Sequence, residues 1–265
     1  KITCESCHSA TPHAEGSKAN DHTDRVACQT CHIPEMAREL PTKMTWDWST
    51  AGKLKDGKTY STKDAFGKKD YLSIKGSFTW AKNVQPEYFW YNGTIKSVTA
   101  ADMIDPGDEV AVSWPVGGPQ DKNSRIAPFK VHRGRQPYDK VHKTLLVPLL
   151  SGNDGYWKTL DWQGALAKGQ AANGLPYSGE FDFVDTTYVF PTTHMVAPKE
   201  KTLACTECHT RDDGRLQNVA GIYMPGRDRN GLLDMLGWVA VAGSLFGVFC
   251  HGIGRVVING KREES

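Results

Sequence analysis

The chain has 265 residues, 39% of them hydrophobic, and a formal net charge of +2 at pH 7. This composition is that of an ordinary soluble protein with one large or two small domains. The basic excess is small and contains no lysine or arginine run beyond pairs, which leaves no electrostatic basis for nucleic-acid binding.

The cysteines follow one repeated pattern. Six of the seven fall in three C-x-x-C-H motifs, CESCH at residues 4–8, CQTCH at 28–32 and CTECH at 205–209. A four-cysteine zinc site needs no histidine after each second cysteine, and a redox dithiol has no use for three scattered copies. Covalent haem c needs this arrangement, because two thiols add to the porphyrin vinyl groups and the adjacent histidine ligates the iron. Three covalent haems are therefore predicted, with structural zinc as the minor alternative.

The thioether-forming residues that these motifs predict are Cys4, Cys7, Cys28, Cys31, Cys205 and Cys208. The proximal iron ligands predicted beside them are His8, His32 and His209. Haem c is attached on the outer side of the cytoplasmic membrane, so the body of the protein is expected in the periplasm. The sequence begins three residues before the first motif without signal-peptide features. We therefore expect either that a signal peptide has been removed or that this is the C-terminal part of a longer chain.

Few regular elements are expected between the second and third motifs. IPEMAREL at 33–40, with Pro34 in its first turn, predicts a short helix after the second haem. KDGK at 55–58 and YNGT at 91–94 predict hairpin-type turns, and YLSIKGSFTW is a short alternating run between them. Asp161 and Gly174 are expected near the start and at the exit of a further helix.

The predicted fold class follows from the haems, which in a multihaem protein supply much of the apolar core. We expect a multihaem cytochrome c of mostly irregular loops with short helices and small β-hairpins wrapped around haems, plus one C-terminal transmembrane helix. The many aromatic side chains of residues 41–130 are interpreted as core packing against loops and haem faces rather than as substrate contacts.

The C-terminal run MLGWVAVAGSLFGVFCHGIG has no formal charge between Asp234 and Arg255. At about 1.5 Å per residue it spans roughly 30 Å, the thickness of a bilayer's hydrocarbon core. The predicted domains are a periplasmic trihaem domain at 1–230, a transmembrane helix at 231–258 and a cytoplasmic tail at 259–265. Arg255, Lys261 and Arg262 then lie on the cytoplasmic side, as the positive-inside rule expects for a single-pass protein with periplasmic haems.

One face of this helix has the features of a packing surface. Gly243 and Gly247 form a G-x-x-x-G pair, and His251 lies four residues further along the same face. The face predicts an integral-membrane partner, and His251 is a possible ligand of a b-type haem in that partner. The alternative is that His251 only hydrogen-bonds a neighbouring residue or a lipid headgroup.

Histidines outside the motifs are candidates for the sixth iron ligand, since low-spin haem iron needs two axial ligands. The candidate distal ligands are His13, His22, His132, His142 and His194. Five candidates exceed the need of three haems, so at least one of His132 and His142 is predicted to ligate a haem attached outside residues 1–265. The alternative is that the surplus histidines bond propionates or the backbone.

Several stretches together resemble the C-terminal part of the octahaem cytochromes c of the tetrathionate reductase family. They are MTWDWSTAGK at 44–53, EYFWYNGT at 87–94, SRIAPFKVHRGRQPYDKVHKTLLVP at 124–148 and PTTHMVAPKEKTLACTECH at 191–209. The resemblance covers most of residues 1–230. It implies bis-histidine haems in a closely packed array, and one special haem with a lysine ligand and a C-x-x-C-K attachment.

The family's activities are reduction of tetrathionate and of small nitrogen oxyanions or hydroxylamine. This sequence departs from the family pattern because it has three attachment motifs rather than eight and no C-x-x-C-K. Its motifs would correspond to the last three haems, so the substrate-reducing haem would lie outside this chain. No catalytic residue carries over.

Three functions remain open from the sequence. The favoured one is a membrane-anchored electron carrier between a quinone or cytochrome b partner and a periplasmic multihaem reductase made of other cytochrome c segments or subunits. The second is an enzyme that reduces tetrathionate, nitrogen oxyanions or hydroxylamine at an open haem. The third is an anchoring subunit. We also expect a basic cluster around His132, which would contact haem propionates or an anionic substrate. The alternative is a solvated loop. The residues of the cluster are Arg125, Lys130, Arg133 and Arg135.

Overall fold

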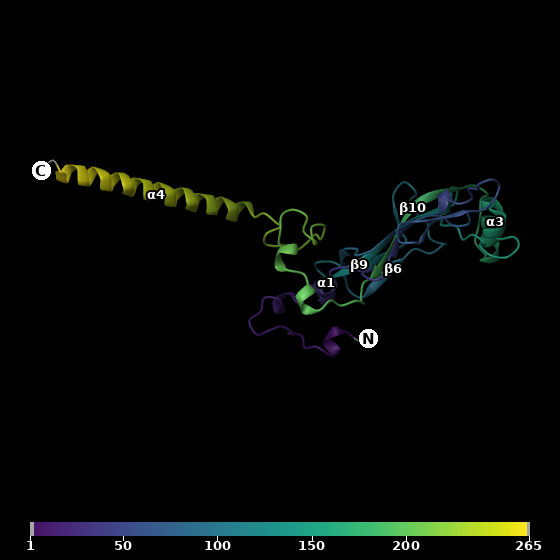
Figure 1. Cartoon of the computed structure of the whole chain (residues 1–265), viewed down its shortest axis with the longest axis horizontal. Coiled ribbons are helices and arrows are strands. Elements are labelled where there is room, and N and C mark those ends of the chain that lie inside the picture. The colour runs from purple at the N-terminus through teal and green to yellow at the C-terminus, as the bar shows by residue number, and fades with distance from the viewer. Residues whose placement is uncertain (1–2, 264–265) are drawn as a thin grey trace. The chain divides into compact units, whose positions relative to one another are not determined.

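A computed structural model of the chain describes residues 3–263, with side chains described as far as Val256. The chain divides into two compact units (Figure 1). The first comprises Lys1–Ala204 and Asn218–Ile222, and the second comprises Cys205–Gln217 and Tyr223–Ser265.

An eight-stranded sheet forms the centre of the first unit, in the order β2-β3-β4-β1-β9-β10-β7, with β5 paired to β9. Its strands are β1 (Thr42–Asp47), β2 (Ser61–Lys63), β3 (Lys69–Leu72), β4 (Gly76–Ala81), β5 (Glu87–Tyr91), β7 (Val110–Ala111), β9 (Arg125–Asp139) and β10 (Phe181–Pro191). A separate two-stranded sheet pairs β6 (Thr94–Ser97) with β8 (Ser113–Val116).

Strand β9 organises this sheet, because it pairs with three other strands along its 15 residues. It runs parallel to β1 and antiparallel to β10 and β5. Its register with β10 is continuous from Phe181 opposite Asp139 to Pro191 opposite Phe129. Figure 1 shows β9 and β10 lying side by side along the sheet.

The predicted fold class is wrong in one respect, since the chain has a large sheet where mostly loops were expected. The sequence of β9 conceals the strand, because Pro128 and Pro137 lie within it and charged side chains interrupt its hydrophobic pattern. Both prolines are accommodated opposite partners in register, Tyr88 and Phe183. The segment between the motifs therefore buries a protein core of its own.

The core beside β9 contains Ala127, Phe129, Val131 and Val189. Phe129 is fully buried, and the rings of Phe89 and Tyr91 meet it edge-on at centroid distances of 5.7 and 5.1 Å. Such aromatic contacts add to the free energy gained from burying the rings.

Replacing Phe129 by alanine is expected to lower the free energy of unfolding by about 3–5 kcal/mol, because the change leaves a cavity in a packed core. Denaturant unfolding of the haem-containing protein measures the loss. Phe66, whose residue surface is 47% exposed, provides the matched control. Its replacement by alanine should change the unfolding free energy by less than about 0.5 kcal/mol. Equal effects of the two changes would contradict the packing described.

The local turn predictions have mixed outcomes. Lys55 and Lys58 pair across Asp56 and Gly57, both with positive φ, so the hairpin at 55–58 is confirmed. The hairpin of β3 and β4 within YLSIKGSFTW is also present. The turn at 91–94 does not make a hairpin, because β5 pairs with β9 whereas β6 pairs with β8.

The helix expected at 33–40 is absent. Met36 instead exchanges both backbone hydrogen bonds with Val84, at 2.9 Å each, and Ala37 has a left-handed φ of 57°. Backbone pairing with a distant part of the same chain has therefore overridden the local helix preference of this segment.

The helix predicted after Asp161 is confirmed as α3 (Trp162–Ala172), which follows the short α2 (Tyr156–Thr159). Trp162 stacks on Tyr156 at 4.0 Å and meets Phe183 edge-on at 5.4 Å, which holds α3 against β10. The remaining short helices are α1 (Cys28–His32), η1 (Cys4–Ser6), η2 (Asn20–His22), η3 (Trp48–Thr50), η4 (Lys199–Lys201) and η5 (Cys205–Glu207).

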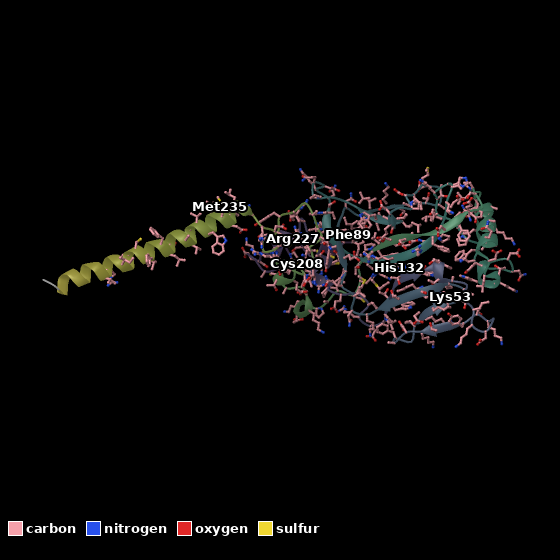
Figure 2. All side chains as sticks on the ribbon, turned by 90° about the horizontal axis from the view of Figure 1, so that it is seen from above. Lys53, Phe89, His132, Cys208, Arg227 and Met235 are labelled. Carbon is pink, nitrogen blue, oxygen red and sulfur yellow. The ribbon has the colours of Figure 1, made fainter. Side chains whose placement is uncertain are left out.

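The second unit contains the third motif and the helix α4 (Gly231–Glu263). Among the described residues, Gly231–Val256 is the one stretch long and apolar enough to cross a membrane, judged by length and composition alone. None of it is buried. Figure 2 labels Met235 on this helix, with side chains projecting around it. The side chains of 257–265, including Lys261 and Arg262 of the expected cytoplasmic tail, lie outside the described part.

Candidate haem sites

All three attachment motifs fold into a single helical turn. His8 and His209 each donate a backbone hydrogen bond of 2.9 Å to the carbonyl of the first cysteine of their motif, and CQTCH forms α1. A turn of this kind places cysteines three positions apart on one side of the backbone. None of the seven cysteines forms a disulfide in the described chain. Each motif therefore presents two thiols and a histidine together, as two thioethers and an axial ligand require.

The second motif is anchored to the start of β9. Thr30, the inner residue of CQTCH, is fully buried and donates its hydroxyl to the carbonyl of Ile126 at 2.8 Å. The amide of Ala27 donates to the same carbonyl at 2.9 Å. On its other side, the carbonyls of Cys31 and His32 accept from Leu203 and Ala197. Segments distant in sequence thus hold this haem-binding turn in place.

The imidazole of His13 lies opposite that of His32. Their ring centroids are 6.2 Å apart and the ring planes differ by 16°. A metal–imidazole bond is about 2.0 Å and the ring centroid lies about 1.1 Å further, so two imidazoles on one metal have centroids about 6.2 Å apart. The spacing of the pair therefore matches axial ligation of one iron between them.

The state of both rings suits ligation. Nδ1 of His13 lies 3.1 Å from the side-chain oxygen of Asn20, which also accepts the His13 amide. If Nδ1 donates this bond, Nε2 is the nitrogen left to ligate a metal. Burial, helped by the charges of His13 and His8, lowers the pKa of His32 and so favours the neutral form that binds iron.

The first two motifs lie next to each other. Burial and the adjacent Cys4 thiol raise the pKa of the Cys28 thiol, and Glu5 forms a 2.7 Å ion pair with Arg125 at the start of β9. Haems attached at Cys4 and Cys28 would consequently be close neighbours.

The third motif, in the second unit, has its own orienting contact. Nδ1 of His209 is 2.8 Å from the carbonyl of Pro225. Gly226 follows with a φ of 89°, and a Cβ there would approach the His209 carbonyl to 2.7 Å. The glycine therefore permits the chain to come close enough to hold the imidazole.

His194 borders a surface cavity of about 500 Å³ in the first unit. The cavity has apolar walls that include Met36, Leu40 and Phe190, and Lys130 and Glu39 are the charged residues that line it. An apolar cleft with an imidazole and an ammonium group suits a porphyrin, whose ring is apolar and whose propionates are anionic. Cavities of this size are typical of cofactor sites.

Two other candidate ligands have backbone partners. Nδ1 of His22 lies 2.8 Å from the Lys18 carbonyl, and Nδ1 of His132 lies 3.3 Å from the Lys43 carbonyl. His132 lies on the sheet, where Figure 2 labels it. Burial, with the charges of Lys130 and Lys43, lowers the pKa of His132 against the effect of the carbonyl contact.

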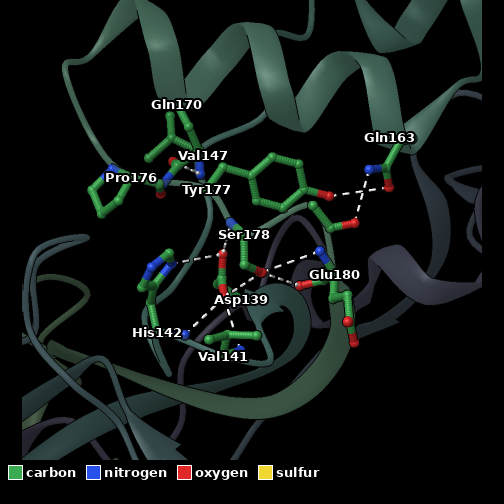
Figure 3. Close-up of polar contacts among 11 residues, drawn as sticks. Asp139, Val141, His142, Val147, Gln163, Gln170, Pro176, Tyr177, Ser178 and Glu180 are labelled. Carbon is green, nitrogen blue, oxygen red and sulfur yellow. Dashed lines mark hydrogen bonds and ion pairs between the residues drawn. The ribbon is translucent and has the colours of Figure 1, made fainter.

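His142 lies in the loop after β9, beside the buried carboxylate of Asp139 (Figure 3). Nδ1 of His142 is 3.2 Å from Asp139 Oδ2. Burial by itself would raise the pKa of Asp139, but hydrogen bonds from Ser178 and His142 outweigh it and hold that pKa well below its usual range.

The basic residues expected around His132 do not form one cluster. Side chains alternate along a strand, so Arg133 and Arg135 lie on the face of β9 opposite Lys130 and His132. The three arginines form ion pairs with Glu5, Glu87 and Asp185.

A different set of cations gathers near His132. The Lys43 ammonium lies over the rings of Trp46 and Phe78, at 4.2 and 3.8 Å from their centroids. Burial, together with Lys75 and Lys130, lowers the pKa of Lys43 to about 8. In the described chain none of these three lysines pairs with a carboxylate, so they suit an anionic group such as a haem propionate.

Sequence reasoning found the motifs and candidate histidines but missed the residues that orient them. Asn20, Pro225 and Asp139 carry no spacing signal, because each contacts its histidine through the fold of a particular loop. His251 is exposed on α4 among apolar side chains, and the described contacts do not assign it a partner.

Paired thiols three residues apart, followed at once by an imidazole, suit a porphyrin joined by two thioethers, and the spacing of His13 from His32 suits a second axial ligand. The residues thus fit haem, and they define a multihaem c-type cytochrome. Residues 43–212 match the family described as bacterial cytochrome c, and the chain belongs to this family. Haem c is accordingly its covalently bound cofactor, and a periplasmic location follows from the same assignment.

A solved structure with the same fold is an octahaem cytochrome c from Shewanella oneidensis. The two share 44% sequence identity with a TM-score of 0.74. The match covers 79% of this chain but only 48% of the other, so this chain spans about half the length of that octahaem protein. No curated protein sequence matches the chain.

All three motifs are expected to carry covalent haem, because each forms the same single turn and none of their described cysteines is in a disulfide. The intact mass of the denatured chain, produced with a cytochrome c maturation system, should exceed the polypeptide mass by three haem increments. Cys205→Ala with Cys208→Ala should remove one increment. A mass with fewer than three increments in the unsubstituted chain would contradict the prediction.

Proposed function

We propose that this chain is the electron-carrying section of a larger multihaem cytochrome c system, with bis-histidine haem irons. The observation that carries the proposal is the His13–His32 pair, with its centroid spacing of 6.2 Å. An iron between two imidazoles has no open position for substrate and keeps the same ligands in both oxidation states. Such a haem transfers electrons rather than binding a reactant.

The closeness of the first two motifs supports a chain of haems rather than isolated ones. Electron hopping is limited by distance, and the Cys4 and Cys28 thiols are neighbours. Haem potentials would then be set by burial and by nearby cations such as Lys43 and Lys130.

The terminal reaction is assigned to haems outside residues 1–265. The octahaem protein of similar fold is about twice as long as the matched region, and the present chain has three attachment motifs without C-x-x-C-K. We infer a relationship to the tetrathionate reductase type, in which the substrate-reducing haem is carried by the rest of the polypeptide or by a partner subunit.

Helix α4 supports a membrane connection for this system. Its large apolar side chains, such as Trp238 and Phe246, are about 70% exposed. We infer a single transmembrane span with the cytoplasmic end at the C-terminus, which would bring electrons from a quinone or cytochrome b partner. The Gly243, Gly247 and His251 face would pack on that partner, and His251 is a candidate ligand of its b-type haem.

Electron paramagnetic resonance of the oxidised chain tests the carrier function. All attached haems should give low-spin ferric signals, and cyanide or nitrite should leave the visible spectrum unchanged over minutes. A high-spin signal that disappears on adding nitrite or hydroxylamine would instead support an enzyme with an open haem.

A further inference from the structure

The loop that follows β9 is built around one buried carboxylate. Asp139 is fully buried, and its side chain accepts the amides of Val141 at 2.9 Å and His142 at 2.8 Å. It also accepts the amide and the hydroxyl of Ser178, at 2.7 and 2.8 Å. Figure 3 shows these contacts converging on Asp139 from two segments of the chain. The carboxylate is therefore held rigidly and remains charged.

The imidazole of His142 lies against this carboxylate. Its Nδ1 is buried 3.2 Å from Asp139 Oδ2, although the two atoms are not aligned as a regular hydrogen bond. The His142 side chain is 39% exposed, and in Figure 3 the other ring nitrogen points away from Asp139. A half-exposed imidazole with an anion behind it can offer the lone pair of its Nε2 to a metal ion outside the loop.

A carboxylate behind a histidine is the usual support of a metal ligand. It favours the tautomer with the proton on Nδ1, fixes the ring orientation and increases the basicity of Nε2. His132, the other surplus histidine, has the opposite surroundings, because the charges of Lys130 and Lys43 act on it. The structure thus distinguishes between two histidines that the sequence could not separate.

No attachment motif of this chain makes a described contact with His142, so we seek its iron outside residues 1–265. The described contacts of His142 are with Asp139. The second haem has its own pair in His32 and His13. The octahaem protein of the same fold is about twice as long as the region it shares with this chain.

We propose that His142 is an axial ligand to the iron of a haem c attached outside residues 1–265, and that Asp139, held by Ser178, is its positioning residue. The proposal rests on the bis-histidine carrier function and adds a specific junction between this chain and the remaining haems.

The test uses the complete native protein or complex with all its haems. His142→Ala should convert one haem equivalent from low-spin to high-spin in the ferric resonance spectrum while leaving the number of covalent haems unchanged. His142→Met should keep that haem low-spin and raise its reduction potential, since methionine ligation does so. Lys140→Ala, a change in the same loop, should alter neither property.

Asp139→Asn tests the positioning role separately. Removing the negative charge weakens the imidazole as a donor, so one component of the potentiometric titration should move to higher potential while the others stay in place. A lower melting temperature without any shift in potential would mean that Asp139 only holds the loop. If this variant does not fold, the His142 variants still test the ligation, because the His142 side chain is half-exposed and its replacement disturbs the core little.

The outcomes separate the two proposals. An unchanged low-spin spectrum in His142→Ala would overturn the ligation proposed for His142. A high-spin signal from the haems attached at residues 4–8, 28–32 or 205–209 would count against the carrier function but not against this junction. The substrate-reducing haem outside the chain is expected to be high-spin with or without the substitution.

Discussion

Replacing His13 by alanine is expected to convert the second haem from low-spin to high-spin in the ferric state. The ring of His13 stands opposite that of His32 at the separation that one iron requires. Without it the iron is left five-coordinate or water-bound. Cyanide, which we expect the bis-histidine haem of the unsubstituted protein to exclude, should then bind within seconds. Resonance and visible spectra should show the change in one of the attached haems, with the covalent haem count unaffected.

Two further variants sharpen this result. His13→Met should restore a low-spin iron at a higher reduction potential, because methionine can ligate in place of histidine. Glu15→Ala, a nearby exposed position, should leave the spectrum as it was. If His13→Ala kept every haem low-spin, another side chain would have to be the ligand opposite His32.

Removing residues 231–263 is expected to release the protein from the membrane into the soluble fraction. The helix α4 exposes large apolar side chains along its length, among them Leu232 at 63%, Trp238 at 74% and Phe249 at 63%. Burying each such side chain in lipid contributes about 1.5–3 kcal/mol, so their sum holds a single helix firmly in a bilayer. Fractionation followed by haem staining measures the change, and the remaining chain should keep its low-spin spectrum.

A point substitution provides a finer test of the same helix. Leu245→Arg places a charge near the middle of the apolar stretch and should weaken insertion by about 3 kcal/mol, whereas Asp234→Asn at its start should not. Retention of the truncated protein by membranes washed in high salt would contradict the anchor. His251→Ala should leave membrane attachment intact, and loss of b-type absorbance from the purified complex would identify it as the ligand there.

The elements that were predicted correctly depend on neighbouring residues. In each C-x-x-C-H motif the two thiols and the imidazole belong to one turn, so their chemistry can be read from five consecutive letters. The hairpin at 55–58 likewise depends on local turn chemistry. Helix α3 ends where Asn173 donates to the Gly169 carbonyl and Gly174 takes a positive φ. These elements follow from local sequence, and tertiary contacts were not needed to predict them.

The large sheet could not be predicted in the same way. Strand β9 pairs with β1 and β10, whose paired residues lie roughly 90 and 50 positions away, and its two prolines argue locally against a strand. The helix prediction for 33–40 was wrong for a similar reason, since the backbone of Met36 pairs with that of Val84. Non-local hydrogen bonds outweighed the local preferences at both places.

The sequence alone determined that this protein attaches haem c and that it carries one long apolar helix, because covalent attachment and hydrophobic length are properties of short, continuous stretches. Only the tertiary structure decided which histidines stand together and which face outward. The pairing of His13 with His32, and the support of His142 by Asp139, depend on loop geometry and on the position of Ser178. An imidazole ligates only in the correct direction and distance, and those are set by the folded chain around it.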